Sequence, residues 1–275
     1  MSGKFGVSGD WAGHRPPHFP INETYLRMPG GGGLGDLICF LGAAGIYAKL
    51  HPAERVFTNV LPEVIEHYDP PVLDYHDCGH VAPLEVFEGQ HRTKHQSPLR
   101  NYVGTFLSSM GEAIKEPPGM ELPRLEPAAG LATGSYIALQ PYSGAARNPE
   151  RRDQFVQALV DSCRNFAPNH PVVCVGHPST TRSISKVHYE HLSGPVGMLQ
   201  VIQHAALVLT PRSASAHIAA AFRVPGFLWL PDDGENWHLD YPHWITRRVS
   251  IGADWETIGS DLCSFLRSLQ IPIPD

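Results

Sequence analysis

Asp36 follows a loop with five glycines in six residues, Gly30–Gly33 and Gly35. The backbone of such a loop can approach a ligand closely, because glycine has no side chain. The loop joins a segment that favours a strand, Thr24–Met28, to one that favours a helix, Leu37–Leu50, and α/β sheets bind ligands at this strand-to-helix edge. A carboxylate there could act as a general base toward a hydroxyl group. Alternatively, Asp36 only caps the helix that follows it.

A turn of small residues separates an apolar strand-like run, Leu207–Thr210, from a helix expected over Ala216–Phe222 and a strand over Gly226–Leu230. The free N–H groups at the start of such a helix are suited to a phosphate or pyrophosphate. The turn would not block that ligand, since its residues are all small: Ser213, Ala214, Ser215 and Ala216. His217 could hydrogen-bond a phosphate oxygen or be a half-buried structural residue. The alternative for the whole stretch is an ordinary crossover with a serine cap.

A second turn with possible phosphate ligands follows the strand expected over Tyr136–Gln140. Ser143 and Gly144 could bind phosphate through their N–H groups, and Arg147 could neutralise leaving-group charge without a metal. Arg147 could equally be a solvated loop residue. Arg212 could pair with a diphosphate or a carboxylate, or form an ion pair with Asp232 or Asp233.

One segment carries metal-binding residue types: His76, Cys78, His80, His91 and His95. Four of them would satisfy the coordination of zinc. The segment lacks a C-x-x-C pair and is polar throughout, which favours a histidine-rich acceptor loop over a metal site. We therefore expect no metal and no bound cofactor.

Composition excludes several classes of protein. The chain has 275 residues, 42% of them hydrophobic and 17% charged, which predicts a soluble globular protein. The formal net charge of −6 argues against a nucleic-acid partner. No apolar run reaches the roughly 18 residues of a transmembrane helix, and the first residues do not form a signal peptide, so we expect a cytoplasmic protein. The five scattered cysteines are expected to be reduced.

The predicted elements alternate between strands and helices. In the first half they are Thr24–Met28, Leu37–Leu50, Glu54–Asn59, Pro62–His67 and Val72–Tyr75, followed by a helix over Asn101–Ile114. Residues 1–22 are expected to be an irregular arm, and the four prolines within Glu116–Ala129 indicate an interdomain linker. The second half contains Tyr136–Gln140, Pro149–Asn165, Pro171–Val175, Gly197–His204, the stretch from Leu207 onward and a C-terminal helix over Trp255–Leu269. This alternation predicts an α/β protein with two Rossmann-like halves.

The stretch from Leu207 onward resembles the C-terminal signature of glycosyltransferase family 9, which contains the bacterial lipopolysaccharide heptosyltransferases. The family pattern is D-[ST]-G-x-x-H-x-A-A-A-x-x-x-P, then G-P-T-D-P-x-x-W; the matching residues here are Ser213, His217, Ala219–Ala221, Pro225, Pro231, Asp233 and Trp237. Gly35-Asp36 resembles the opening G-D motif of the family, and Gln140–Gly144 resembles its H-P-G-S-G turn. Arg212 and Ala214 depart from the pattern, because the family has Asp and Gly there.

This resemblance implies a GT-B fold, in which two facing Rossmann-like domains enclose a cleft. Residues 1–125 would bind the acceptor, and residues 126–275 would bind a nucleotide-sugar donor. It implies a metal-independent, inverting transfer of a sugar from a nucleoside diphosphate to a hydroxyl group of a saccharide, a lipid-linked glycan or a small molecule. Asp36 would be the base, and the donor-binding residues would be Gly33, Gly35, Ser143, Gly144, Arg147, His177, Met198, Arg212, Ser213, Ala214, Ser215, Ala216, His217 and Asp233.

Three points stay open at this stage. Arg212 replaces an aspartate that touches the donor sugar in the family, so heptose is not implied. The same fold could support epimerisation or hydrolysis of a nucleotide sugar. The chain could also be a binding protein that has lost catalysis.

Overall fold

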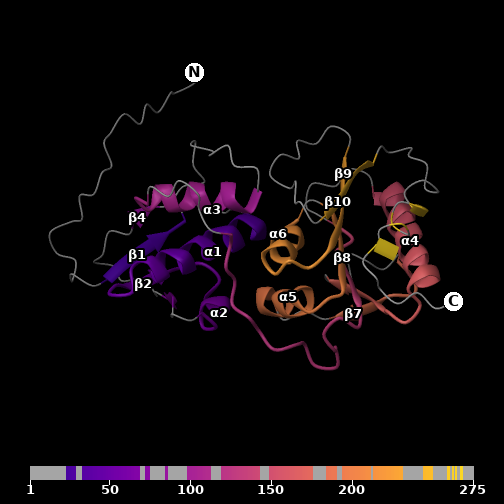
Figure 1. Ribbon diagram of the computed structural model, residues 1–275, viewed down its shortest axis with the longest axis horizontal. Coiled ribbons are helices and arrows are strands. Elements are labelled where there is room, and N and C mark those ends of the chain that lie inside the picture. Colours follow the sequence, from indigo (N-terminus) through magenta and orange to yellow (C-terminus); the bar gives the residue numbers. More distant parts are fainter. Residues whose placement is uncertain are drawn as a thin grey trace, which may run out of the picture.

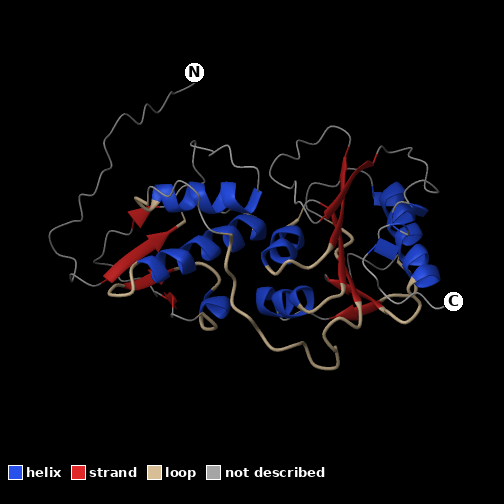
Figure 2. Ribbon diagram, viewed as in Figure 1, coloured by secondary structure: helices blue, strands red, loops and turns tan. Residues whose placement is uncertain are grey.

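The computed structural model contains two parallel β-sheets with helices packed against them (Figures 1 and 2). It describes residues 23–28, 33–68, 72–74, 84–85, 98–112, 119–142, 149–175, 184–190, 194–211, 213–231, 244–249, 259, 260, 262, 264, 267 and 268.

The first sheet has four parallel strands in the order β3-β2-β1-β4. Its strands are β1 Glu23–Arg27, β2 Arg55–Thr58, β3 Val72–Asp74 and β4 Leu84–Glu85. The helices of this half are α1 Leu34–Leu50, α2 Pro62–Ile65 and α3 Pro98–Ser109. The order of strands reverses beside β1, and β1 is the strand that leads into α1. Ligands of open α/β sheets bind at such a reversal, beyond the carboxyl ends of the strands.

The second sheet has six parallel strands in the order β10-β9-β8-β5-β6-β7. Its elements are β5 Ile137–Leu139, α4 Pro149–Phe166, β6 Val172–Val175, β7 His188–Glu190, α5 Gly194–Gln203, β8 Leu207–Pro211, α6 Ala214–Ala221, β9 Gly226–Pro231 and β10 Trp244–Val249. Counted within this half, the order is that of a classic doubly wound sheet, 3-2-1-4-5-6. The reversal lies between β5 and β8, so the turns that follow these two strands flank the expected ligand site.

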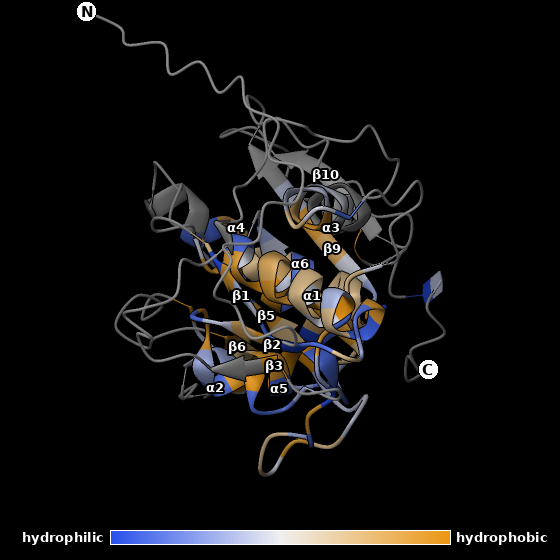
Figure 3. Cartoon of the chain, turned by 90° about the vertical axis from the view of Figure 1, so that its left-hand side faces the viewer, coloured by the Kyte–Doolittle hydropathy of each residue, from blue (hydrophilic) through white to orange (hydrophobic). Residues whose placement is uncertain are grey.

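Alternate residues of the second sheet face two different apolar layers. Ile137, Leu207 and Phe227 pack with α4, while Ala138, Val208 and Leu228 belong to the core on the side of α5 and α6. That second core continues without a break into the first half, and it includes α1 residues from Ile38 to Ala48, all of them buried. Helix α1 is apolar on all sides because β2 and β3 lie along one side of it, and α3 and α6 pack against other sides. Figure 3 shows α1 and α6 side by side as apolar helices.

Residues 119–128, which we call the strap, join the two halves as an extended segment. The Met120 side chain lies against Gly42 of α1, and the Leu125 N–H and C=O bond the Gln203 side chain at 3.1 and 3.0 Å. His204 Nε2 lies 2.7 Å from the Leu125 carbonyl oxygen. These residues form neither helix nor strand, and they pack against both halves. That they link two separate domains stays a prediction.

Most expected elements are present, and the differences lie at helix starts and in short strands. Helices α1, α5 and α6 begin two or three residues earlier than predicted, at Leu34, Gly194 and Ala214. Helix α3 is shifted by several residues toward the N-terminus. Their first turns are rich in small residues, proline or polar residues, which carry no apolar periodicity. Strands β4, β7 and β10 were not predicted. The expected C-terminal helix is helical at its six described positions, and the expected arm at 1–22 lies outside the described residues.

Candidate functional site

The first turn of α1 holds the predicted base in a defined place. The helix begins at Leu34 with Gly33 as its N-cap residue, so Asp36 is the third helical residue and does not precede the helix. Its Oδ2 accepts the Gly33 N–H at 2.9 Å. Asp36 therefore does cap the helix, through this hydrogen bond. A carboxylate accepts several hydrogen bonds, so one bond to Gly33 leaves Asp36 capacity to receive a proton from a substrate hydroxyl group.

The start of α6 provides main-chain donors. Its N-cap residue Ser213 is extended and makes no side-chain bond to the helix; its Oγ lies 2.8 Å from Thr210 Oγ1 instead. The first N–H groups of the helix, at Ala214 and Ser215, therefore receive no hydroxyl cap from Ser213 and point beyond the carboxyl end of β8. Such a helix start favours an anion, and the binding of a phosphate here stays a prediction.

The turns after β5 and β8 are joined by side chains. Ser215 is fully buried, and its Oγ donates to Gln140 Oε1 at 2.7 Å. Gln140 Nε2 donates to the Tyr142 carbonyl oxygen at 3.0 Å, and the Tyr142 hydroxyl donates to Asp153 Oδ1 of α4 at 2.7 Å. The sequence did not single out Gln140 as a site residue. The available signal was a polar residue directly after an apolar strand, in the turn that resembles the family motif.

The two helix starts touch each other. A Cβ placed on Gly35 would lie 3.2 Å from His217 Cδ2, 3.6 Å from His217 Nε2 and 3.7 Å from Ala214 Cα. His217 is 6% exposed, so it is a buried residue rather than the half-buried one expected. Only a residue without a side chain allows this approach at ordinary contact distances. The predicted base at Asp36 and the predicted phosphate turn at Ser213–His217, far apart in the sequence, are therefore neighbours.

The other predicted site residues are placed less favourably or not at all. Met198 lies in α5 with 7% of its surface exposed, and its side chain packs in the apolar core; a contact with a nucleotide stays a prediction. Six predicted donor-binding residues lie outside the described residues: Ser143, Gly144, Arg147, His177, Arg212 and Asp233. The histidine-rich segment from His76 to His95 also lies outside them.

The described part of the chain holds neither a metal-binding cluster nor a membrane-spanning helix. It holds no group of three or more His, Cys, Asp or Glu residues that could bind a metal ion. None of its helices has the length and apolar character needed to cross a membrane.

The comparisons with known proteins give a fold. No protein-family model matches the sequence, and no curated protein matches it. Among solved structures, the E. coli heptosyltransferase WaaC with ADP-2-deoxy-2-fluoro heptose superposes with a TM-score of 0.61 and 10% identity, covering 90% of this chain and 99% of WaaC. A glycosyltransferase family 9 protein from Veillonella parvula gives 0.55 and 12%, covering 93% of this chain and 90% of that protein.

A third neighbour is longer than this chain. The iron-containing dodecameric glycosyltransferase TibC from enterotoxigenic E. coli gives a TM-score of 0.58 and 15% identity, covering 82% of this chain but only 62% of TibC. The protein therefore has the α/β fold of a class of glycosyltransferases. Within that class, it resembles the heptosyltransferases of family 9, as the sequence motifs predicted, and the likeness at these identities is one of fold.

Proposed function

We propose that this protein is a metal-independent, inverting glycosyltransferase that moves a sugar from a nucleoside-diphosphate donor to a hydroxyl acceptor. The two sheets would belong to the two facing domains of a GT-B fold. The first half would hold the acceptor and the second half the donor, with the boundary in the strap near residue 125.

The contact between Gly35 and the pair Ala214 and His217 carries this proposal. Each partner begins a helix that follows a strand beside a reversal of strand order, where α/β sheets bind ligands. A carboxylate on one side and main-chain N–H donors on the other are the two groups that sugar transfer from a diphosphate requires.

The reaction follows from these positions. The acceptor oxygen attacks the anomeric carbon as the bond from that carbon to the diphosphate oxygen breaks. Asp36 takes the acceptor proton, and the N–H groups at Ala214 and Ser215 bind the charge that develops on the departing diphosphate. Arg147 and Arg212 would add positive charge there. A single displacement of this kind inverts the anomeric centre.

The identity of the transferred sugar has to be determined by experiment. WaaC is described with ADP and with an ADP-heptose analogue, so ADP is the first nucleotide to test. Arg212 replaces the aspartate that the family motif places beside the donor sugar, so a sugar other than heptose is an equal candidate.

The first experiment is a thermal-shift screen of ADP, GDP, UDP, CDP and dTDP, with and without Mg²⁺. A ligand at about 100 times its Kd adds roughly 2.7 kcal/mol of stability, which raises the melting temperature measurably. We expect one diphosphate to stabilise the protein equally with and without Mg²⁺. Stabilisation by none of the five, or only with the metal, contradicts the proposal.

A pair of variants then separates the two roles of Asp36. In Asp36→Asn the amide oxygen still accepts the Gly33 N–H, but the side chain no longer takes a proton. We expect it to fold and bind the diphosphate as the wild type does, and to lose turnover of the matching nucleotide sugar by at least a hundredfold. Asp36→Ala should also lose about 1 kcal/mol of stability, since the cap is gone. Full turnover in Asp36→Asn would leave capping as the only role; diphosphate binding without turnover in the wild type would favour a non-catalytic binding protein.

A further inference from the structure

We propose that Gln140 is a positioning residue of the donor site, which holds the first turn of α6 in place to receive the diphosphate. The inference rests on the proposed function and names a residue that none of the predicted donor contacts included. Gln140 directly follows β5, and its main-chain N–H donates to the Leu209 carbonyl oxygen of β8 at 2.9 Å. Its side chain therefore starts from a point fixed between the two strands at which the strand order reverses.

The hydrogen bonds of Gln140 fix the orientation of its amide. A carbonyl oxygen only accepts, so the group that faces the Tyr142 carbonyl must be the amide nitrogen. The amide oxygen then faces Ser215, and the Ser215 hydroxyl must donate to it. Each end of the amide thus has one possible partner type, and the residue joins the turn after β5 to the helix after β8 in a single geometry.

This geometry determines what α6 offers to a ligand. Both hydroxyl groups at its start are directed to protein neighbours, Ser213 toward Thr210 and Ser215 toward Gln140. Ser213 makes no side-chain cap bond, and the Ser215 hydroxyl is directed to Gln140, so the first main-chain N–H groups of α6 are not capped by the Ser213 hydroxyl. Gln140 acts through Ser215: it holds the second helical residue, and with it the N–H groups that would bind the diphosphate. The Tyr142 hydroxyl extends the connection to Asp153, so α4 is tied to the same turn.

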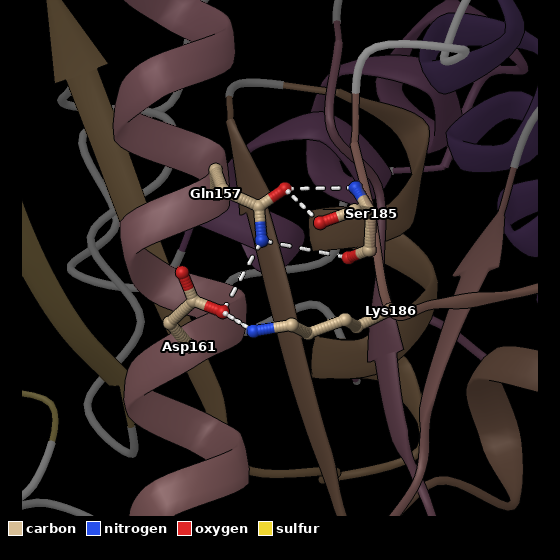
Figure 4. Close-up of polar contacts among 4 residues, drawn as sticks. All are labelled: Gln157, Asp161, Ser185 and Lys186. Carbon is tan, nitrogen blue, oxygen red and sulfur yellow. Dashed lines mark hydrogen bonds and ion pairs between the residues drawn. The ribbon is translucent and has the colours of Figure 1, made fainter.

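The chain supplies a matched control in Gln157 of α4. Its amide makes the same kind of connection, because Oε1 accepts the Ser185 N–H at 2.8 Å and Nε2 lies 3.3 Å from Asp161 Oδ1 (Figure 4). Lys186 follows Ser185 in the sequence, and its Nζ lies 3.3 Å from the same Asp161 oxygen. Ser185 precedes β7, so this cluster lies toward the amino edge of the sheet and away from the predicted donor site.

The test measures the dissociation constant of the diphosphate that stabilises the wild type, by isothermal titration calorimetry. We expect Gln140→Ala to weaken binding about tenfold and Gln157→Ala to leave it unchanged, although Gln157→Ala also removes hydrogen bonds from both ends of an amide. Gln140→His should bind within about threefold of the wild type, because a neutral imidazole also carries one donor and one acceptor. The double variant Gln140→Ala with Ser215→Ala should bind no more weakly than Gln140→Ala alone. Both changes remove the same contact, the hydrogen bond from Ser215 to Gln140.

The outcomes are distinguishable. If the wild type binds a diphosphate and Gln140→Ala binds it equally well, the positioning role is refuted while the proposed function stands. An equal loss in Gln157→Ala, or additive losses in the double variant, would also refute it, because the effect would then be a general loss of stability. If the wild type binds none of the five diphosphates, the proposed function fails and the role of Gln140 with it.

Discussion

Replacement of Gly42 by alanine tests how the strap lies on α1. A Cβ at this position would lie 2.2 Å from Met120 Cγ and 2.9 Å from Met120 Sδ, well inside the usual contact distance of about 3.5 Å or more. The Met120 side chain, which is 4% exposed, would have to leave its place. Its burial contributes about 2 kcal/mol, whereas alanine in a helix gains about 1 kcal/mol over glycine. We therefore expect Gly42→Ala to lower the free energy of unfolding by about 1 kcal/mol.

A double-mutant cycle makes this prediction specific. Met120→Ala alone should cost about 2–4 kcal/mol, because it removes a buried side chain. In that background Gly42→Ala has no clash left to make, so it should be neutral or stabilise by up to about 1 kcal/mol. The Gly42→Ala effect thus changes from about 1 kcal/mol destabilising to neutral or stabilising, which is a coupling of about 1–2 kcal/mol.

Gly119→Ala is the matched control, since it changes the residue next to Met120. Among the described residues, no atom beyond its chain neighbours lies within 4 Å of the added methyl group. It should be neutral or slightly stabilising. All variants are compared by urea unfolding followed by circular dichroism. If Gly42→Ala is as stable as Gly119→Ala in the wild-type background, the strap does not pack against α1 as described.

Two further predictions use other contacts of α1. Gly35→Ala places a methyl group 3.2 Å from His217 Cδ2, so residue 35 or His217 must move by a few tenths of an ångström. We expect the free energy of unfolding to stay within about 1 kcal/mol of the wild type. Turnover of the nucleotide sugar should be at least tenfold slower. Unchanged turnover would show that this contact does not set the site. Burial, and secondarily the charge of Glu121, holds the pKa of the Tyr68 phenol well above its usual value. The unfolded chain loses that proton above about pH 10 while the folded chain keeps it, so stability falls as pH rises from there. Tyr68→Phe should lose less stability between pH 9 and pH 11 than the wild type in urea titrations; an equal loss would contradict the shifted pKa.

The sequence predicts the elements of this fold better than its contacts. The uninterrupted apolar runs of α1, β6 and β8 identify them at once, because buried elements of α/β proteins are apolar on every side. Strands β4 and β7 have two and three residues, too few to carry a period. Strand β10 contains two adjacent arginines and stands at the end of the sheet among the described strands, beside β9. Its sequence lacks the apolar character of the central strands.

For the candidate site, too, the sequence indicates the residues better than their contacts. Asp36 and the Ser213–His217 turn are visible in the sequence because glycines and small residues follow strand-like runs there. The contact of Gly35 with His217 is not visible, because it depends on how two halves of the chain pack. The bond between Gln140 and Ser215 joins residues 75 positions apart, and it exists because β5 and β8 are neighbours in the sheet.

The three glycines of α1 allow close packing on this helix, and two of them, Gly35 and Gly42, lie where the second half and the strap meet it. Each costs up to about 1 kcal/mol relative to alanine in a helix, and each has a specific neighbour: His217 at Gly35, Met120 at Gly42 and Tyr68 at Gly45. At 3.6 residues per turn, Gly35 and Gly42 point in nearly the same direction, so α6 and the strap contact one side of α1 in succession. The strap continues to Gln203 and His204 at the end of α5. The position of Asp36 relative to α6 is thus set twice, by direct contact at Gly35 and through the strap at Gly42. If Asp36 is the base and the start of α6 binds the diphosphate, as we propose, this packing fixes their relative position. Little rearrangement is then needed to orient the reacting groups, and such orientation lowers the barrier to transfer.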